Sequence, residues 1–202
     1  MKYLQLADSV IMEGKRKIPR LKGYSSALQL IGTGRSAYVF KVQDEQIALK
    51  VFFPHKTHLA REEAAIYRKL PSGSYYPTLH EGGKNYIVID YLDGYTLFHY
   101  LENGIYIQEE KIYAINEALE MARKAGLNPS DIHLKNIMIT SNKQVKLIDV
   151  ARFRQTEKDR QWDDLQKVYF KGYVKPYFPK RIPRFILNCI AAVYKTGLRF
   201  IG

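Results

Sequence analysis

Residues 131–153, DIHLKNIMITSNKQVKLIDVARF, decide the fold and the chemistry that this sequence predicts. The two apolar runs, IMI and VKLI, favour strands and are separated by a polar turn, so we expect a β-hairpin. Asp131 and Asn136 precede the hairpin and are five residues apart, and Asp149 follows Asn136 by thirteen residues. Phosphoryl transfer needs Mg²⁺ and a base near the acceptor, and Mg²⁺ prefers carboxylate and amide oxygens as ligands. Each residue alone could be ordinary turn chemistry, but together they indicate a site for metal-bound nucleotide.

A second pattern lies upstream, where residues 28–42, LQLIGTGRSAYVFKV, alternate apolar side chains around a turn containing Gly32 and Gly34. The run IALKVFF at 47–53 follows as a further strand, so a hairpin and a third strand are expected. Because the glycines lead into strand-forming residues rather than into a helix, the pattern does not favour a Rossmann dinucleotide fold. Taken alone, it favours a plain hairpin turn.

The rest of the chain is predicted to contain more helix than strand. Residues 58–70 are good helix formers and end at Pro71, and residues 107–125 have apolar side chains at helical spacing before Gly126. Residues 86–92, YIVIDYL, favour a strand that a turn at Asp-Gly closes. Strands and one helix come first and mostly helices follow, which is typical of an α+β protein with two unequal lobes.

Composition limits the class of protein. The chain has 202 residues, 46% hydrophobic and 13% aromatic, enough to bury a core as one domain. Its formal net charge of +12 favours a partner rich in phosphate or carboxylate, such as nucleotide, nucleic acid, anionic lipid or acidic protein. No recognisable nucleic-acid-binding motif accompanies this charge.

Cysteine content and the chain ends bear on location. Cys189 is the only cysteine, which excludes an intrachain disulfide or a multi-cysteine zinc site and fits a reducing cytoplasm. Charges interrupt the first apolar stretches, so the start does not resemble a signal peptide. The longest apolar segment near the other end, 185–194, is too short to span a membrane. We expect a cytoplasmic protein, either soluble or peripheral to the membrane.

In this order, the motifs resemble the protein kinase superfamily. The glycine turn is similar to the family's G-x-G-x-x-G-x-V, with Ala37 in the place of the third glycine. Ala48-Leu49-Lys50 resembles the V-A-I-K strand, and Glu63 is the match for the helical glutamate that pairs with this lysine. Glu62 is the alternative partner.

The resemblance implies a role for each of these residues. Asp131 would orient or deprotonate the acceptor hydroxyl, and Asn136 and Asp149 would bind Mg²⁺ that bridges the phosphates of ATP. Lys50 would reach the same phosphates. The expected nucleotide-binding residues, several of which would otherwise be ordinary core, are Ile31, Gly32, Gly34, Val39, Ala48 and Met138, with Ile89 behind the base and the backbone of Asp90 to Leu92 at its edge.

The resemblance covers roughly residues 28–170 and implies an α+β, two-lobed protein-kinase-like fold. The N-lobe would be small and β-rich, and the C-lobe reduced and mostly helical. In compactness the chain looks most like small bacterial atypical kinases of the YrzF-like kind. We expect three parts: an N-terminal extension at 1–26, the N-lobe at 27–92 and the C-lobe at 93–202.

Several positions depart from the family pattern. Pro129 and Ser130 replace His-Arg before Asp131, and Val-Ala replaces Phe-Gly after Asp149. His133 lies where Ser/Thr kinases have a lysine, a pattern that looks like the aminoglycoside and choline phosphotransferases. We expect His133 to be a structural hydrogen-bonding group.

Two further expectations concern residues on either side of the hairpin. Lys135 is a candidate to replace the lysine that is missing at position 133. Asp163 follows Asp149 by only fourteen positions, too few for a long peptide-binding segment. Asp163 or Asp164 is expected to hold the catalytic loop from a following helix.

The C-terminal segment 180–202 has two interpretations. Its apolar stretch could form a closing helix of the C-lobe. Alternatively, because the stretch is accompanied by basic side chains, it could be an amphipathic helix on an anionic membrane surface. The basic residues are Lys180, Arg181, Arg184, Lys195 and Arg199.

The expected activity is Mg-ATP-dependent phosphorylation of a hydroxyl group, on serine or threonine of a protein substrate. A small-molecule or glycolipid kinase is the first alternative, favoured by His133 and the short segment after Asp149. A nucleotide-binding pseudokinase scaffold is the second, favoured by the missing His-Arg and the altered D-F-G.

Overall fold

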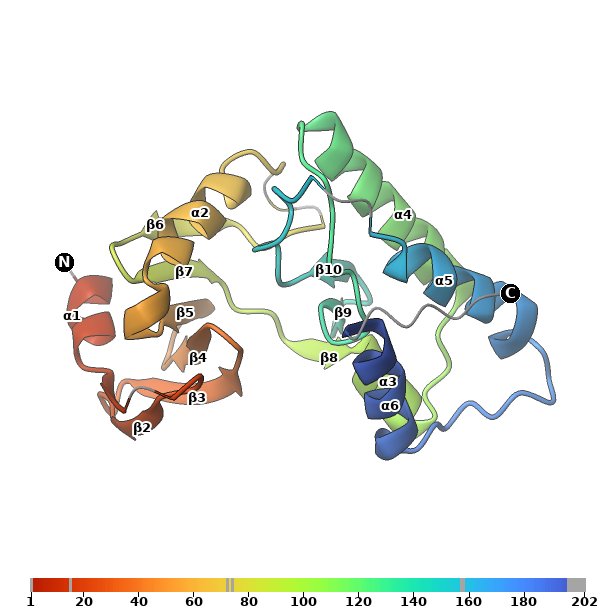
Figure 1. Cartoon of the computed structure of the whole chain (residues 1–202), viewed down its shortest axis with the longest axis horizontal. Helices are drawn as coiled ribbons and strands as arrows, with labels where there is room; N and C mark the ends of the chain where they lie inside the picture. The colour runs from red at the N-terminus through yellow and green to blue at the C-terminus, as the bar shows by residue number, and fades with distance from the viewer. Residues whose placement is uncertain (1, 15, 72, 74, 157–158, 196–202) are drawn as a thin grey trace. The chain divides into compact units, whose positions relative to one another are not determined.

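The structure is a computed structural model that describes residues 2–14, 16–71, 73, 75–156 and 159–195. The chain forms two compact units, Met1–Leu92 and Asp93–Gly202 (Figure 1). The first unit is rich in strands, and the second is mostly helical. This architecture confirms the α+β class that the sequence predicted.

A five-stranded antiparallel sheet forms the centre of the first unit, in the order β3-β4-β5-β7-β6. The predicted glycine hairpin is β3 and β4, and the strand after it is β5. Strand β6 was not predicted, because it is short and its apolar content is low. The strands are β3 (Leu28–Thr33), β4 (Ala37–Val42), β5 (Ile47–Phe52), β6 (Leu79–Gly82) and β7 (Tyr86–Asp90).

A short 3₁₀ turn, η1 (Pro54–Lys56), and helix α2 (His58–Tyr67) follow β5. Helix α2 lies alongside β6 and β7 (Figure 1). It ends three residues earlier than the predicted segment 58–70, although Leu70 is still buried. The buried residues of α2 include Glu63, so this helix brings a carboxylate into the interior of the unit.

The N-terminal residues cover one face of the five-stranded sheet. They form α1 (Lys2–Asp8) and a two-stranded sheet of β1 (Ile11–Glu13) and β2 (Arg20–Gly23). The Tyr38 hydroxyl donates a 2.6 Å hydrogen bond to the carbonyl of Pro19, and the Tyr3 hydroxyl donates one of 2.8 Å to Glu45. Shared apolar packing joins the segment to the sheet through Ala7, Leu28, Tyr38, Phe40, Val42, Leu49, Val51, Phe53, Tyr86 and Val88.

The sequence did not predict these N-terminal elements. Their strands have three and four residues, and much of their surface is exposed. Such short strands depend on tertiary contacts rather than on intrinsic propensity. Ala7 is the buried residue that this segment adds to the core of the first unit, and partly buried apolar side chains pack against this core.

The second unit combines helices with a three-stranded antiparallel sheet in the order β10-β9-β8. The predicted hairpin is β9 (Ile137–Thr140) and β10 (Val145–Leu147), and β8 (Gly94–Thr96) pairs with β9. The helical elements are α3 (Leu97–Asn103), α4 (Glu109–Lys124), α5 (Gln161–Val168), the π-helical turn η2 (Tyr169–Tyr173) and α6 (Arg184–Lys195).

Gly94 was predicted in a turn but begins strand β8. Its φ is 156°, and a Cβ at this position would lie 2.3 Å from the carbonyl oxygen of Ile139. Only glycine allows the two backbones to approach this closely. Turn chemistry and close strand approach both select glycine, which explains the wrong assignment.

Helix α6 lies against α3 (Figure 1), and basic residues before and in it contact the same unit. Arg181 donates a 3.3 Å hydrogen bond to the carbonyl of Glu102, and Arg184 pairs with its carboxylate at 3.0 Å. Lys180 donates a 3.0 Å hydrogen bond to the carbonyl of Lys175. These contacts favour the closing-helix interpretation, and the membrane contact stays a prediction. Residues 196–202 lie outside the described part of the chain.

Among the residues that the structure describes, no helix has the length and apolar content needed to cross a bilayer.

Candidate active site

A buried ion pair joins β5 to α2 in the first unit. The Lys50 Nζ atom lies 2.7 Å from Glu63 Oε1 and 2.8 Å from Oε2. The exposed fractions of the two side chains are 10% and 1%. Buried charges are tolerated when they are paired and hydrogen-bonded, as here. Glu63 is the partner of Lys50, and Glu62, the alternative, is exposed.

Strand register places three of the predicted nucleotide-binding residues on the same sheet face as Lys50. Val39 is directly opposite Lys50, and Ala48 is directly opposite Ile89. Directly opposite residues share a face, and so do residues two apart on one strand. This face is the one opposite to the N-terminal covering. Val39, Ala48, Ile89 and Lys50 therefore form one surface of the first unit.

The glycine turn makes a tight connection between β3 and β4. The Gly34 amide donates a 2.9 Å hydrogen bond to the carbonyl of Ala37, and a Cβ on Gly34 would lie 3.4 Å from that oxygen. Gly32 is opposite Val39, and the register shifts between Leu30 and Gly32. The shift leaves Ile31 in a bulge, with 44% of its surface exposed.

Two backbone amides at the end of β7 already have acceptors within the first unit. The Asp90 amide donates to the carbonyl of Thr78 at 3.1 Å, and the Tyr91 amide donates to that of Gln46 at 2.9 Å. Both groups are therefore satisfied by the first unit itself. Within the described residues, the Leu92 amide has no such partner and remains the candidate donor for a ligand.

The Asp90 side chain is also engaged. Partial burial raises its pKa, but hydrogen bonds outweigh this effect and leave the pKa below its ordinary value. The donors are the Thr78 amide at 2.7 Å and the His80 ring, whose Nε2 lies 2.7 Å from the carboxylate. The Asp90 carboxylate thus joins the end of β7 to the start of β6.

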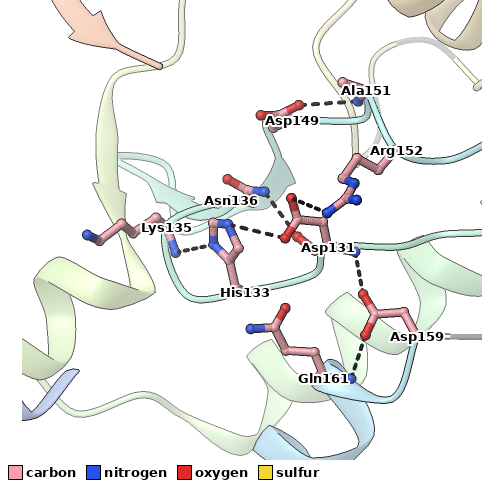
Figure 2. A network of polar contacts seen from close by, with 9 residues as sticks. All are labelled: Asp131, His133, Lys135, Asn136, Asp149, Ala151, Arg152, Asp159 and Gln161. Carbon is pink, nitrogen blue, oxygen red and sulfur yellow. Dashed lines mark hydrogen bonds and ion pairs between the residues drawn. The ribbon is translucent and has the colours of Figure 1, made fainter. Parts of the chain in front are cut away.

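Asp131 begins a loop of the second unit. Hydrogen bonds hold this loop on both sides (Figure 2). Its backbone has a φ of 63°, and its amide donates to the Asp159 carboxylate. The Asn136 side-chain nitrogen donates to the Asp131 carbonyl at 3.0 Å, and the Asn136 carbonyl accepts from the Ile148 amide at 3.0 Å. The loop is thereby connected to the end of β10, just before Asp149.

Asn136 and Asp149 lie at the same end of the β9–β10 hairpin, because Ile137 is directly opposite Leu147. The Asn136 side-chain nitrogen donates to the Asp131 carbonyl. The carboxamide oxygen of Asn136 therefore points away from that carbonyl. Asp149 Oδ1 accepts a 3.2 Å hydrogen bond from the Ala151 amide. Fully buried Val150 anchors this segment in place of the family's phenylalanine.

This donor set fits Mg²⁺. Mg²⁺ is bound by one or two carboxylate or amide oxygens, and waters and substrate phosphates complete the octahedron. Among the described residues no group of three histidine, cysteine or acidic side chains gathers at one point. The pair Asn136 and Asp149 is consistent with a metal held jointly with phosphates. Met138, the remaining predicted nucleotide-binding residue, is partly buried in β9.

The acidic residue that holds the Asp131 loop is Asp159, so the expectation of Asp163 or Asp164 was wrong. Asp163 is exposed, and the Asp164 carboxylate pairs with Lys167 at 3.3 Å. Asp159 accepts from the Asp131 amide and, at 2.8 Å, from the Gln161 amide at the start of α5. An aspartate two residues before a helix start is a local turn signal that indicates the contact with Gln161, but it does not indicate the contact with Asp131.

The expectation for Lys135 was also wrong. Its Nζ atom donates a 3.2 Å hydrogen bond to the Asn188 side chain and lies 4.3 Å from the centre of the Phe98 ring. In Figure 2 its side chain points away from Asp131. The side chains beside Asp131 are His133 and Arg152, each 3.8 Å from one carboxylate oxygen.

Comparisons with known proteins agree with this geometry. A model of the protein kinase domain matches residues 25–176. "Putative serine/threonine-protein kinase YrzF" of Bacillus subtilis (strain 168) is 47% identical over 192 residues, which are 94% of this chain and 89% of the relative.

Longer relatives match over part of their length. A protein of Clostridium acetobutylicum named a probable serine/threonine-protein kinase is 28% identical over 185 residues, 83% of this chain but 28% of that protein. A protein of Streptomyces coelicolor with the same description is 30% identical over 154 residues, 64% of this chain and 22% of its own length. With the kinase-domain model covering most of its length, the chain belongs to the protein kinase domain family.

Proposed function

We propose that this protein is a Mg-ATP-dependent kinase that phosphorylates serine or threonine hydroxyls of protein substrates. The main support is the hydrogen-bonded path through the second unit. Asn136 joins the candidate base Asp131 to the strand end that precedes Asp149. The names of the relatives add the serine/threonine class.

Each residue of the proposal has a defined task. Lys50, fixed by Glu63, provides a positive charge for the ATP phosphates, because the paired carboxylate restricts its position. Asn136 and Asp149 would hold Mg²⁺. When bound, the metal neutralises negative charge on the phosphate oxygens.

Asp131 acts on the acceptor. Its carboxylate accepts a hydrogen bond from the acceptor hydroxyl and takes its proton as the oxygen bonds to the γ-phosphorus. The bond from that phosphorus to its bridging oxygen breaks, and ADP leaves. The side chain is only 18% exposed, which restricts access of water to the carboxylate.

The test uses the full chain with γ-labelled ATP, Mg²⁺ and a bacterial lysate or a generic protein acceptor. We expect labelled phosphoserine or phosphothreonine, which excess EDTA abolishes. Asp149→Ala should abolish transfer, and Asp163→Ala, at an exposed position on α5, should not. Undiminished transfer by Asp149→Ala would contradict the metal role. Mg-ATP binding without transfer to any acceptor would favour the scaffold alternative.

A small-molecule or glycolipid kinase is the second candidate. The observation that favours it is the short connection after Asp149, since α5 already begins at Gln161. A panel of sugars, amino alcohols and lipids, assayed beside protein acceptors, separates the two. Phosphate found only on small molecules would replace the protein-kinase proposal.

The cytoplasm is the proposed location. ATP is available there, and the single cysteine, Cys189, does not require an oxidising compartment.

A further inference from the structure

The Arg152 guanidinium lies close to the candidate base Asp131, and Arg152 directly follows residues 149–151, which correspond to D-F-G. Its Nη1 atom lies 3.8 Å from Asp131 Oδ2. The other carboxylate oxygen, Oδ1, lies 3.8 Å from His133 Nε2. Figure 2 shows the two side chains approaching Asp131 from different sides. The carboxylate is therefore flanked on both oxygens.

A second contact fixes the guanidinium group. In the carboxamide orientation that satisfies both residues, the Gln155 side-chain oxygen accepts from Arg152 Nε at 2.8 Å and from Nη2 at 3.0 Å. The Gln155 carbonyl in turn accepts a 2.7 Å hydrogen bond from the Asn128 side chain. Because Gln155 engages one edge of the planar guanidinium, Nη1 remains for Asp131.

The local backbone supports this arrangement. Fully buried Val150 and Phe153 lie on either side of Arg152 in the sequence, and the Phe153 amide donates to the Val150 carbonyl at 3.0 Å. Arg152 therefore projects from an anchored turn rather than from a loose loop. About half of its side chain, 49%, is exposed, so the positive charge also reaches the solvent side of Asp131.

Phosphoryl transfer needs a positive charge close to the oxygens of the migrating group. Lys135, a cation in the loop that begins at Asp131, contacts Asn188 and Phe98 instead. We propose that Arg152, held by Gln155, is a positioning residue that orients the Asp131 carboxylate and provides positive charge beside the acceptor. This inference rests on the proposed function.

The experiment compares Arg152→Ala, Arg152→Lys and Gln155→Ala with the matched control Arg154→Ala. Arg154 is exposed, carries the same charge and lies two residues away. The rate of transfer from Mg-ATP to myelin basic protein gives kcat and KM for ATP. Calorimetry gives the affinities for Mg-ADP and for Mg-ADP with aluminium fluoride, a mimic of the migrating phosphoryl group. Thermal unfolding verifies that each variant is folded.

We expect Arg152→Ala to lower kcat about 10- to 100-fold, with KM for ATP changed less than about twofold. The affinity for the aluminium fluoride complex should fall by a similar factor, while the affinity for Mg-ADP stays unchanged. Arg152→Lys and Gln155→Ala should lose about 3- to 10-fold, since they keep a cation but not its fixed geometry. Added guanidinium ion should partly restore Arg152→Ala.

Three results would overturn the inference. They are full kcat in Arg152→Ala, an equal loss in Arg154→Ala, and weakening of Mg-ADP to the same extent as its aluminium fluoride complex. If the unaltered protein transfers no phosphate to any acceptor, the proposed function fails first and the inference fails with it.

Discussion

The candidate functional residues of the two units are held in different ways. Lys50 and Glu63 lie on a strand and a helix, and their charges are buried in a direct ion pair. Asp131 lies in a loop, is partly exposed, and is held through backbone hydrogen bonds to Asp159 and Asn136. In the first unit, chemistry and folding stability depend on the same atoms. In the second unit they are largely separate.

The largest expected effect tests the second unit. Asp131→Asn removes the base while keeping the size and the backbone contacts of the residue, so transfer should fall about 10²- to 10⁴-fold. The free energy of unfolding should change by less than about 1 kcal/mol, because the His133 ring and the Arg152 guanidinium each lie 3.8 Å from a carboxylate oxygen. Single-turnover transfer and urea unfolding measure the two quantities. A loss of stability as large as the loss of rate would remove the contrast between the units.

The second prediction tests the first unit, where stability should change strongly. Lys50→Met leaves Glu63, 1% exposed, without its ion-pair partner and should destabilise the protein by about 3–5 kcal/mol. Urea unfolding measures this. Replacing both residues, as Lys50→Met with Glu63→Leu, should recover much of the lost stability while transfer stays impaired. A single variant as stable as the original chain would show that the pair has no structural role.

A smaller effect is expected at Asp159. Asp159→Ala removes the acceptor for the Asp131 and Gln161 amides and should cost about 1–3 kcal/mol in stability, with a fall in kcat of about tenfold. Asp164→Ala is the control, because Asp164 forms a surface pair with Lys167. If the control lowers kcat as much as Asp159→Ala does, the loop is held in some other way.

The smallest effect is a dependence of stability on pH in the first unit. Burial and the hydrogen bond to Glu81 raise the pKa of Tyr86 to about 12, because both favour the neutral phenol. This contribution is complete below the unfolded pKa of about 10 and is lost as the pH rises from about 10 to 12.

Urea midpoints measured across that pH range should therefore fall less steeply for Tyr86→Phe than for the original chain. Tyr177→Phe, at a position that is 82% exposed, is the control. Parallel profiles for all three proteins would contradict the assignment to Tyr86.

Much of the fold was predictable because the relevant signals are local. The glycine hairpin, the strand containing Lys50, the long helix α4 and the hairpin before Asp149 each have a periodic apolar pattern. Glu63 was identified because apolar residues three, four and seven positions later mark the inward side of a helix. The spacing of Asp131, Asn136 and Asp149 then identified the loop and hairpin that contain them.

The features that were missed depend on contacts between distant residues. Nothing local shows that Asp159 binds the Asp131 amide, 28 residues away, or that Lys135 turns to Asn188, 53 residues away. Nothing local shows either that the Asp90 amide donates to the Thr78 carbonyl or that the Tyr91 amide donates to the Gln46 carbonyl. Sequence spacing predicts the type of chemistry, but only tertiary contacts show which neighbours restrain these residues.

The N-terminal covering of the first sheet means that the packed unit begins before the stretch that the kinase-domain model matches. The family model begins to match at residue 25, yet α1 and the β1–β2 sheet complete the core around Phe40. A chain cut at residue 25 would expose a continuous aromatic and aliphatic surface to water. Such a fragment should self-associate even if its catalytic loop is intact, so boundaries for isolating the domain are better chosen from packing than from the start of the family-model match.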